Sequence, residues 1–387
     1  MSIAGIVAEF NPFHNGHKYL IDCAKNDGHK VFCVISGNFV QRGDTSVISK
    51  FERARQALLS GADLIAELPC PWSMSTAQNF AIGAVSQLNA IGIDILYFGS
   101  ECGDLDALIK LSDILISKQF SNILKEKLQS GKTFANIRQE ALSEIDASLS
   151  RILNGPNDAL AVEYISAARK INPNIKFKAI KRKGAQHNDL TADEKFSNAT
   201  LLRERIKIGD YEYLRKYMPA SSIEVLSNAE ISDIQKIENA ILASLRMMNR
   251  DEFKNAPDVS EGMENVIYGA VKTARSLEEL YSTAKSKRYT HARIRRIILS
   301  SFLKIDKSLF KTEPPYVRIL GFSGNAASLL PKEPTKPIIT KVSQLDLNDR
   351  AVKNVFETEC RITDIYNLSL DHIKECGSEM TAQIIKI

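Results

Sequence analysis

The amino-acid sequence contains no hydrophobic run that approaches the ~18 residues needed to span a membrane, so no membrane partner is expected. No basic segment and no cleavage site precede the first apolar stretch, which predicts a cytoplasmic protein. None of the six cysteines stands in C-x-x-C spacing, and this argues against both a zinc site and a disulfide framework. The length of 387 residues then suggests two or three ordinary globular domains.

Positive charge is modest overall but is concentrated in one segment. The net charge is +5, yet residues 281–318 contain ten Lys and Arg against two acidic residues, so this segment carries +8 and the rest carries −3. An aromatic residue and a histidine, Tyr289 and His291, lie among the cations, as suits RNA backbone and stacking contacts. We therefore predict an RNA-binding helix over 285–303 with Arg288, Arg295 and Arg296 pointing outward; a merely solvated basic helix is the alternative. No DNA partner is expected.

Short apolar segments alternate with helical patterns in the first half of the chain. This alternation predicts an α/β fold with a doubly wound, Rossmann-like parallel sheet, in which ligands bind beyond the carboxyl ends of the strands. The loops at 9–17, 36–43 and 99–101 all fall on that edge. We expect strands at 3–8, 30–36, 63–68, 94–98 and 175–180, with a helical insertion at about 104–150.

Two histidines stand where the first strand gives way to a helix. His14 and His17 are three residues apart, so both rings lie on one face of the helix N-terminus. Free backbone N–H groups and the positive end of the helix dipole point the same way. Gly16 leaves room for a phosphate against the backbone. A single histidine in a turn is usually a solvated polar residue, but this H-x-G-H context predicts nucleotide binding.

A second arrangement suited to phosphate occurs at 196–206 (FSNATLLRERI). Ser197, Asn198 and Thr200 can cap a helix N-terminus, and Arg203 lies one turn further on the same face as Thr200. Upstream, the strand at 175–180 runs into the cations of 181–184 (KRKG), which are well placed for phosphate. An ordinary capped helix and a solvated basic loop are the alternatives for these two segments.

The segment 219–222 (PASS) is the best candidate for a domain boundary. Residues 1–218 would then form the nucleotide-binding catalytic domain, and residues 222–387 a mainly helical, basic domain. Amphipathic helices are predicted there at 233–246 and 265–276, in addition to the basic helix.

The motifs occur together in one known family. Residues 9–17 (EFNPFHNGH) and 199–203 (ATLLR) resemble the HxGH and S-x-T-x-x-R-type signatures of the nucleotidyltransferase superfamily, whose members attack the α-phosphate of a nucleoside triphosphate. Most of the chain resembles bacterial tRNA(Met) cytidine acetate ligases, although that family usually has Ser where this chain has Asn198. Further matching segments are 36–37 (SG), 41–43 (QRG), 98–101 (FGSE), 156–157 (PN), 181–182 (KR), 287–290 (KRYT) and 320–321 (LG).

The resemblance implies a two-step reaction. Acetate attacks the α-phosphate of ATP to give acetyl-adenylate and pyrophosphate, and the acetyl group then passes to N4 of the wobble cytidine of elongator tRNA(Met). The expected partners are therefore ATP, acetate, this tRNA and Mg²⁺, for which the sequence shows no dedicated carboxylate cluster, so no protein metal site is expected.

The resemblance also assigns roles to residues of this chain. His14, His17 and Arg203 are the expected catalytic residues, and phosphate would favour protonated imidazoles. The expected ATP-binding residues are Val7, Ala8, Glu9, Phe10, Asn11, Pro12, Phe13, His14, Asn15, Gly16, His17, Lys18, Tyr19, Leu20, Gly99, Asn157, Arg182 and Thr200. The expected tRNA-binding residues are Lys285, Lys287, Arg288, Arg293, Arg295 and Arg296.

Two other functions remain open at this point. An adenylyltransferase acting on a small phosphorylated metabolite would explain the H-x-G-H motif and Arg203 equally well, although it leaves the basic helix unexplained. A non-catalytic RNA-binding protein on a nucleotidyltransferase scaffold would explain the basic helix.

Overall fold

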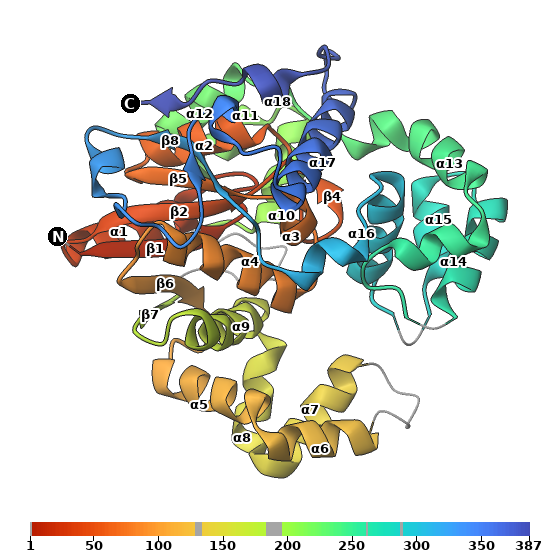
Figure 1. Ribbon diagram of the computed structural model, residues 1–387, viewed down its shortest axis with the longest axis horizontal. Coiled ribbons are helices and arrows are strands. Elements are labelled where there is room, and N and C mark those ends of the chain that lie inside the picture. Colours follow the sequence, from red (N-terminus) through yellow and green to blue (C-terminus); the bar gives the residue numbers. More distant parts are fainter. Residues whose placement is uncertain (1, 128–133, 183–195, 261, 287–288) are drawn as a thin grey trace.

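A central sheet with helices on both faces organises the computed structural model, which describes residues 2–127, 134–182, 196–260, 262–286 and 289–387 (Figure 1). Five strands from the first half are parallel, in the order β5-β2-β1-β6-β7, so the chain winds outward in both directions from β1. The predicted doubly wound α/β fold is therefore confirmed. These strands are β1 (Ile3–Ala8), β2 (Lys30–Ser36), β5 (Leu64–Leu68), β6 (Ile95–Ser100) and β7 (Lys176–Lys181).

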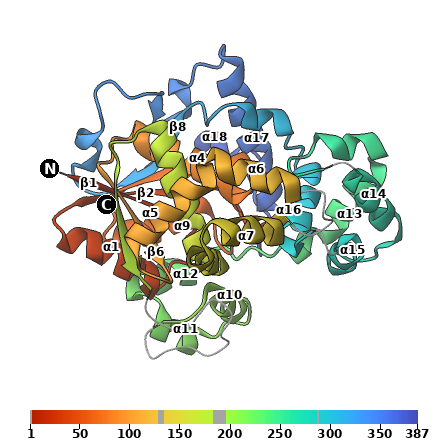
Figure 2. The same cartoon turned by 90° about the horizontal axis from the view of Figure 1, so that it is seen from below.

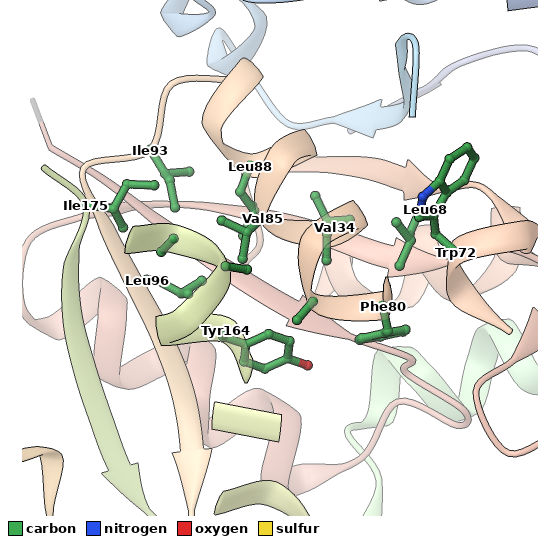
Figure 3. Packing of buried hydrophobic residues seen from close by; sticks show 14 of the residues in the cluster. Val34, Leu68, Trp72, Phe80, Val85, Leu88, Ile93, Leu96, Tyr164 and Ile175 are labelled. Atoms are coloured by element: carbon green, nitrogen blue, oxygen red, sulfur yellow. The ribbon is translucent and has the colours of Figure 1, made fainter. Parts of the chain in front are cut away.

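Apolar residues on both faces explain why these segments are central strands. In β2 and β5 nearly every residue is buried, as expected for a parallel sheet covered on both sides. One face packs against α4 (Ala77–Ala90) and α9 (Pro156–Ile171), and Figure 3 shows the side chains that meet there. The other face packs against α1 (Asn15–Asn26) and α2 (Lys50–Leu59).

The last part of the chain returns to this sheet, which the sequence did not lead us to expect. Strand β8 (Val317–Phe322) pairs antiparallel with β5, and β9 (Ile338–Ile339) and β10 (Ile385–Lys386) pair with β8. The N- and C-terminal halves therefore share one sheet, and the domain limits at 218 and 222 stay a prediction.

Two groups of helices lie beside the sheet. Between β6 and β7, the chain forms α5 (Leu105–Ile116), α6 (Lys118–Lys127), α7 (Phe134–Ile145) and α8 (Ala147–Ser150). They project beyond α9 in Figure 1 and occupy the stretch where a helical insertion was expected. After β7 come α10 (Ala199–Lys207), α11 (Tyr211–Tyr217) and α12 (Ala220–Ser227).

Four further helices form a separate cluster to one side of the sheet in Figures 1 and 2. The predicted single helix over 285–303 is wrong at its start, because the helix begins only at His291. Thr290 has extended backbone and its side chain accepts the N–H of Arg293, which is the geometry of an N-cap. The four helices are α13 (Glu238–Met247), α14 (Met263–Thr273), α15 (Leu277–Ala284) and α16 (His291–Phe302).

Charged side chains buried behind β5 fasten the C-terminal segment to the sheet. The ammonium of Lys50 lies 2.5 Å from Glu67, 2.8 Å from Glu379 and 3.8 Å from Glu359. Arg318 also pairs with Glu379. Glu359 lies on α17 (Arg350–Asn367) and Glu379 on α18 (Ser378–Thr381), while β3 (Phe39–Val40), β4 (Asp44–Thr45) and α3 (Cys70–Ser73) complete this region.

Candidate active site

The loops at the carboxyl edge of the sheet enclose a cavity of about 570 Å³. The cavity is lined by His14, Gly16 and His17 at the start of α1. Gly99 at the end of β6, Asn157 at the start of α9 and Arg182 after β7 line it as well. The sheet therefore brings together the residue groups that the sequence singled out from distant segments.

The H-x-G-H turn holds its two imidazoles in one defined tautomer. The Nδ1 atom of His14 accepts the N–H of Gly16 at 3.0 Å, and the Nδ1 atom of His17 accepts the N–H of His14 at 3.3 Å. The two rings stack with centroids 3.7 Å apart. Since each Nδ1 accepts a backbone N–H, the neutral ring carries its proton on Nε2. A Cβ atom at Gly16 would lie 2.9 Å from the His14 ring, so only glycine permits this packing.

Both histidines are neutral in the free protein. Burial, together with the charges of Arg182 and Arg203, lowers the pKa of His14 to about 3. Burial and the neighbouring His14 lower the pKa of His17 well below its usual value. The expectation that a bound phosphate favours protonated imidazoles concerns the liganded site and stays a prediction; in the unliganded protein burial and the neighbouring guanidinium of Arg182 oppose protonation. Neutral imidazoles still act as hydrogen-bond donors through Nε2.

This protonation state predicts a flat pH profile near neutrality. We expect kcat/KM for ATP to show no loss between about pH 6 and pH 8 from histidine deprotonation, since both rings of the free enzyme are already neutral there. The measurement is the rate of acetate-dependent ATP–pyrophosphate exchange at low ATP concentration, from about pH 6 to pH 8. A decline in kcat/KM on raising the pH through about 6.5 would mean that an imidazolium is needed.

A buried arginine that the sequence did not reveal holds the strand ends in place. The guanidinium of Arg53 is fully buried and donates to the carbonyl oxygens of Ser36 at 2.9 Å, Gly37 at 2.5 Å and Glu9 at 2.5 Å. These carbonyls belong to the turns after β1 and β2, where backbone groups have no partner within the sheet. Arg53 therefore satisfies buried acceptors and fixes the loops that form the cavity floor.

The second motif reaches the H-x-G-H turn through Arg203. Its guanidinium donates to the carbonyl of Asn11 at 2.9 Å and to the hydroxyl of Thr200 at 3.0 Å. Arg42 also donates to Thr200, at 3.4 Å. Asn198 is the N-cap of α10, and its side-chain oxygen accepts the N–H of Leu201 at 2.8 Å. Asparagine therefore performs the capping role that serine would perform at this position.

The carboxylates of Glu101 and Asp158 fix the start of α9, which lines another part of the cavity. Glu101 accepts from the side chain of Asn157 at 2.5 Å and from the N–H of Asp158 at 2.9 Å. Asp158 in turn accepts the N–H groups of Glu101 and Cys102, each at 3.0 Å. The side-chain oxygen of Asn157 accepts from Arg182, whose Nη1 atom lies 3.5 Å away.

Comparison with known proteins identifies the family. A family model described as HIGH Nucleotidyl Transferase matches residues 1–380. Proteins named tRNA(Met) cytidine acetate ligase from Thermoanaerobacter sp. and Clostridium perfringens are 38% and 36% identical, and each match covers both chains completely. The chain belongs to the tRNA(Met) cytidine acetate ligase family.

Solved structures of this family have the same fold. Thermotoga maritima TmcAL without ligand superposes with a TM-score of 0.94 at 31% identity, over the full length of both chains. The same protein bound with alpha-thio ATP superposes with a TM-score of 0.91 at 30% identity, again over both full lengths. The ligase family is therefore supported by sequence and by structure.

The predicted ATP-binding residues do not all face the cavity. Phe10 and Phe13 are buried in the core, and both rings pack against His17. Thr200 and Arg203 are not among the lining residues and stand behind them. The residues of the predicted set that do line the cavity are Val7, Ala8, Glu9, His14, Gly16, His17, Tyr19, Leu20, Gly99, Asn157 and Arg182; Asn11, Pro12, Asn15 and Lys18 lie outside this lining.

The cavity also has walls that sequence reasoning missed. Thr76, Ala77 and Phe80 line it from the start of α4, and Leu160 and Tyr164 line it from α9. In the sequence these residues belong to the apolar stripes of two core helices, so nothing distinguished them from packing residues. Additional lining residues are Gln41, Arg42, Pro156, Ala159, Ile180, Lys181, Phe196, Ser197, Asn198, Ala199, Ala292 and Arg296.

The arginine side chains of the basic helix α16 make more contacts within the protein than expected. The prediction that Arg296 points outward is wrong, because its side chain is only 13% exposed, whereas the Arg295 side chain is 35% exposed. Arg295 lies over the Tyr281 ring, whereas Arg296 pairs with Asp258 at 3.0 Å and reaches the cavity. Arg293 donates twice to the carbonyl of Asp258. Lys285 is exposed, and Lys287 and Arg288 lie outside the described residues.

Proposed function

We propose that the chain activates acetate with ATP and transfers the acetyl group to N4 of the wobble cytidine of elongator tRNA(Met), in the cytoplasm. The observation that carries this proposal is the pair of neutral imidazoles that face the cavity from the N-terminus of α1. Their Nε2–H groups are fixed donors for phosphate oxygens, next to the guanidinium of Arg182. Family membership supports the choice of substrates.

In the first step, an acetate oxygen bonds to the α-phosphorus and the bond from that phosphorus to the bridging oxygen of pyrophosphate breaks. His14 and His17 donate hydrogen bonds to the phosphate oxygens as negative charge moves onto pyrophosphate. Arg203 acts from behind by holding the Asn11 carbonyl, and thereby the turn that carries both rings. In the second step, N4 of cytidine attacks the acetyl carbon, the bond from that carbon to the phosphate oxygen breaks so that AMP departs, and N4 loses one proton to solvent. The substrate carboxylate is the nucleophile, so no covalent enzyme intermediate is needed.

Mg²⁺ would enter with ATP and not through a protein site. The described residues contain no group of three or more His, Cys, Asp or Glu arranged to hold a metal. Among the described lining residues the only carboxylate belongs to Glu9, and one of its oxygens already accepts the N–H of Gln41 at 2.9 Å. No helix in the described part of the chain could cross a membrane.

The tRNA is proposed to lie along α16 and the segment before it. Ala292 and Arg296 of this helix line the cavity, so the helix links the basic segment to the reaction site. Lys285, Arg293, Arg295 and Arg296 are the proposed contacts within the described residues, and Lys287 and Arg288 are proposed from the sequence.

The proposed surface predicts a change in the salt dependence of tRNA binding. Replacing exposed Lys285 by alanine should reduce the slope of log affinity against log salt by about 1, because one phosphate contact is lost. Lys272→Ala, an exposed lysine on α14, is the matched control and should leave the slope unchanged. The measurement is filter binding of tRNA between 50 and 200 mM salt, the range over which such contacts weaken strongly. Equal slopes for all three proteins would place the tRNA elsewhere.

The activity itself is tested by incubating the protein with labelled acetate, ATP and tRNA. We expect label to enter elongator tRNA(Met) at its wobble cytidine and nowhere else, and only when ATP is present. Label in a small phosphorylated metabolite, or no label despite tRNA binding, would overturn the proposal.

A further inference from the structure

One wall of the cavity is formed by apolar and aromatic side chains of α4 and α9. Phe80 and Tyr164 lie side by side, with ring centroids 6.4 Å apart, and Figure 3 shows them together at the edge of the core. Ala77 and Leu160 extend the same wall. Apolar residues such as Leu20, Ile180 and Phe196 also line other parts of the cavity, where they alternate with imidazole, guanidinium and amide groups. The surface formed by Ala77, Phe80, Leu160 and Tyr164 is therefore suited to a small apolar group, and we call it the apolar wall.

The apolar wall contains one polar atom without a partner. Tyr164 is only 6% exposed as a residue, and no hydrogen bond joins its hydroxyl to a residue that the structure describes; this oxygen is not one of the fully buried unpartnered atoms, so it is accessible from the cavity. A hydroxyl that opens onto a cavity can bind a water molecule or a ligand there. Burial and the charge of Glu9 raise the pKa of Tyr164, so the group stays protonated and can donate. A hydrogen-bond acceptor on a ligand is the natural partner for this group.

The apolar wall and the histidines approach the cavity from opposite faces of the sheet. Helices α4 and α9 cover one face, and α1 covers the other. Val7, Ala8 and Glu9, at the end of β1, line the cavity between them. A nucleophile that displaces pyrophosphate must attack the α-phosphorus from the side opposite the leaving group. With pyrophosphate held by the histidines, that side is the apolar wall.

We propose that the apolar wall is the subsite for the short-chain carboxylate, with the methyl group of acetate against Ala77 and Phe80 and one carboxylate oxygen accepting the Tyr164 hydroxyl. This inference deepens the proposed function and rests on it. The negative charge of Glu9 is offset in the cavity by Arg42, Arg182 and Arg296, so an anion can enter. Tyr164 orients the nucleophile and gives up no proton, and the covalent changes are those of the first step above.

Three variants test the subsite. Tyr164→Phe removes only the hydroxyl; Ala77→Val narrows the space at the methyl group; Phe80→Leu enlarges it without the large cavity that alanine would leave. Tyr268→Phe is the matched control, because it removes a tyrosine hydroxyl on α14, away from the cavity. The readout is ATP–pyrophosphate exchange without tRNA, with formate, acetate or propionate as the acid.

The subsite predicts that the KM values for the acid change while the KM for ATP does not. Tyr164→Phe should raise the KM for acetate about 10- to 100-fold, the loss expected for a hydrogen bond to a charged group. Ala77→Val should favour formate over acetate, and Phe80→Leu should favour propionate, each by about 10-fold or more, because one methylene in a fitted pocket discriminates by that amount. Tyr268→Phe should match the unmodified protein.

Two outcomes would overturn the subsite while leaving the proposed function intact. In the first, exchange depends on acetate, but the preference among formate, acetate and propionate and the KM for acetate are the same in all variants. The other is a rise in the KM for ATP with no change for the acid, which would make the apolar wall part of the adenosine site. If the unmodified protein shows no exchange that depends on acetate, the proposed function itself fails.

Discussion

Replacing His17 by alanine is expected to lower acetate-dependent ATP–pyrophosphate exchange about 100- to 1000-fold, the usual loss when one fixed donor to a developing charge is removed. The Nδ1 atom of His17 accepts the N–H of His14, which orients the ring and leaves the Nε2–H free to donate. His14→Ala should act similarly. The measurement is the exchange rate at saturating acetate and ATP.

The fold must survive for this result to report on catalysis. His17 packs against Phe10 and stacks on His14, so its loss also removes packing. Thermal unfolding of the variant therefore accompanies the rate measurement. His372→Ala is the matched control, since that side chain is 86% exposed and its partner among the described residues is Glu230. An intact His17→Ala protein with nearly normal exchange would remove the imidazole from the mechanism.

The largest expected effect on stability comes from Lys50. Its ammonium is fully buried between Glu67, Glu359 and Glu379. Lys50→Met keeps much of the volume but leaves the buried Glu67 carboxylate without its ion-pair partner, while Arg318 still pairs with Glu379, so we expect a loss of about 3–5 kcal/mol in the free energy of unfolding. The measurement is denaturant unfolding at pH 7. A variant as stable as the unmodified protein would show that the cluster reorganises without the lysine.

Glu359 provides a contrasting substitution within the same cluster. Burial and the charge of Glu67 raise the pKa of Glu359 to about 8, and Lys50 opposes this shift. Glu359 is therefore mostly protonated at pH 7 and resembles glutamine. Its Oε1 atom still accepts the N–H of Cys70 at 2.6 Å, a bond that a glutamine oxygen can also accept. Glu359→Gln should thus cost about 1 kcal/mol or less, the net contribution of a single hydrogen bond.

The raised pKa also predicts a pH dependence of stability. Between about pH 4.5 and pH 8 the unfolded chain loses the Glu359 proton while the folded protein keeps it, so folding takes up a proton. Stability from this group is therefore fully present below about pH 4.5 and is lost as the pH rises toward 8. Glu359→Gln should have a smaller decline over this range than the unmodified protein. An identical decline in both proteins would show that Glu359 is ionised in the folded state.

Much of the fold was predictable because its signals are local. The strands β1, β2 and β5 are short apolar runs bounded by turn residues, and His14, Gly16 and His17 stand at a strand–helix junction. The addition of β8 was not predictable in this way. Its partner β5 lies about 250 residues earlier in the chain, and a six-residue, mostly apolar segment says nothing about which strand it will pair with.

The site residues that the sequence did not reveal were missed for a similar reason. Phe80 and Tyr164 have the spacing of core residues, and only the packing of α4 on α9 shows that they also line a cavity. Arg53 looked like one charge among several on an amphipathic helix, yet it is buried and donates to four backbone carbonyls. The prediction that Arg296 points outward was wrong because Asp258, which is distant in sequence, pairs with Arg296.

The central claim is that acetate attacks the α-phosphorus of ATP at the H-x-G-H turn, and oxygen transfer tests it most directly. Acetate labelled with ¹⁸O in both oxygens would be incubated with ATP, the protein and elongator tRNA(Met), and the products analysed by mass spectrometry. An acetyl-adenylate leaves one labelled oxygen on AMP when the acetyl group departs, so the account predicts one ¹⁸O in each AMP. Label in inorganic phosphate with formation of ADP, or AMP without label, would contradict it.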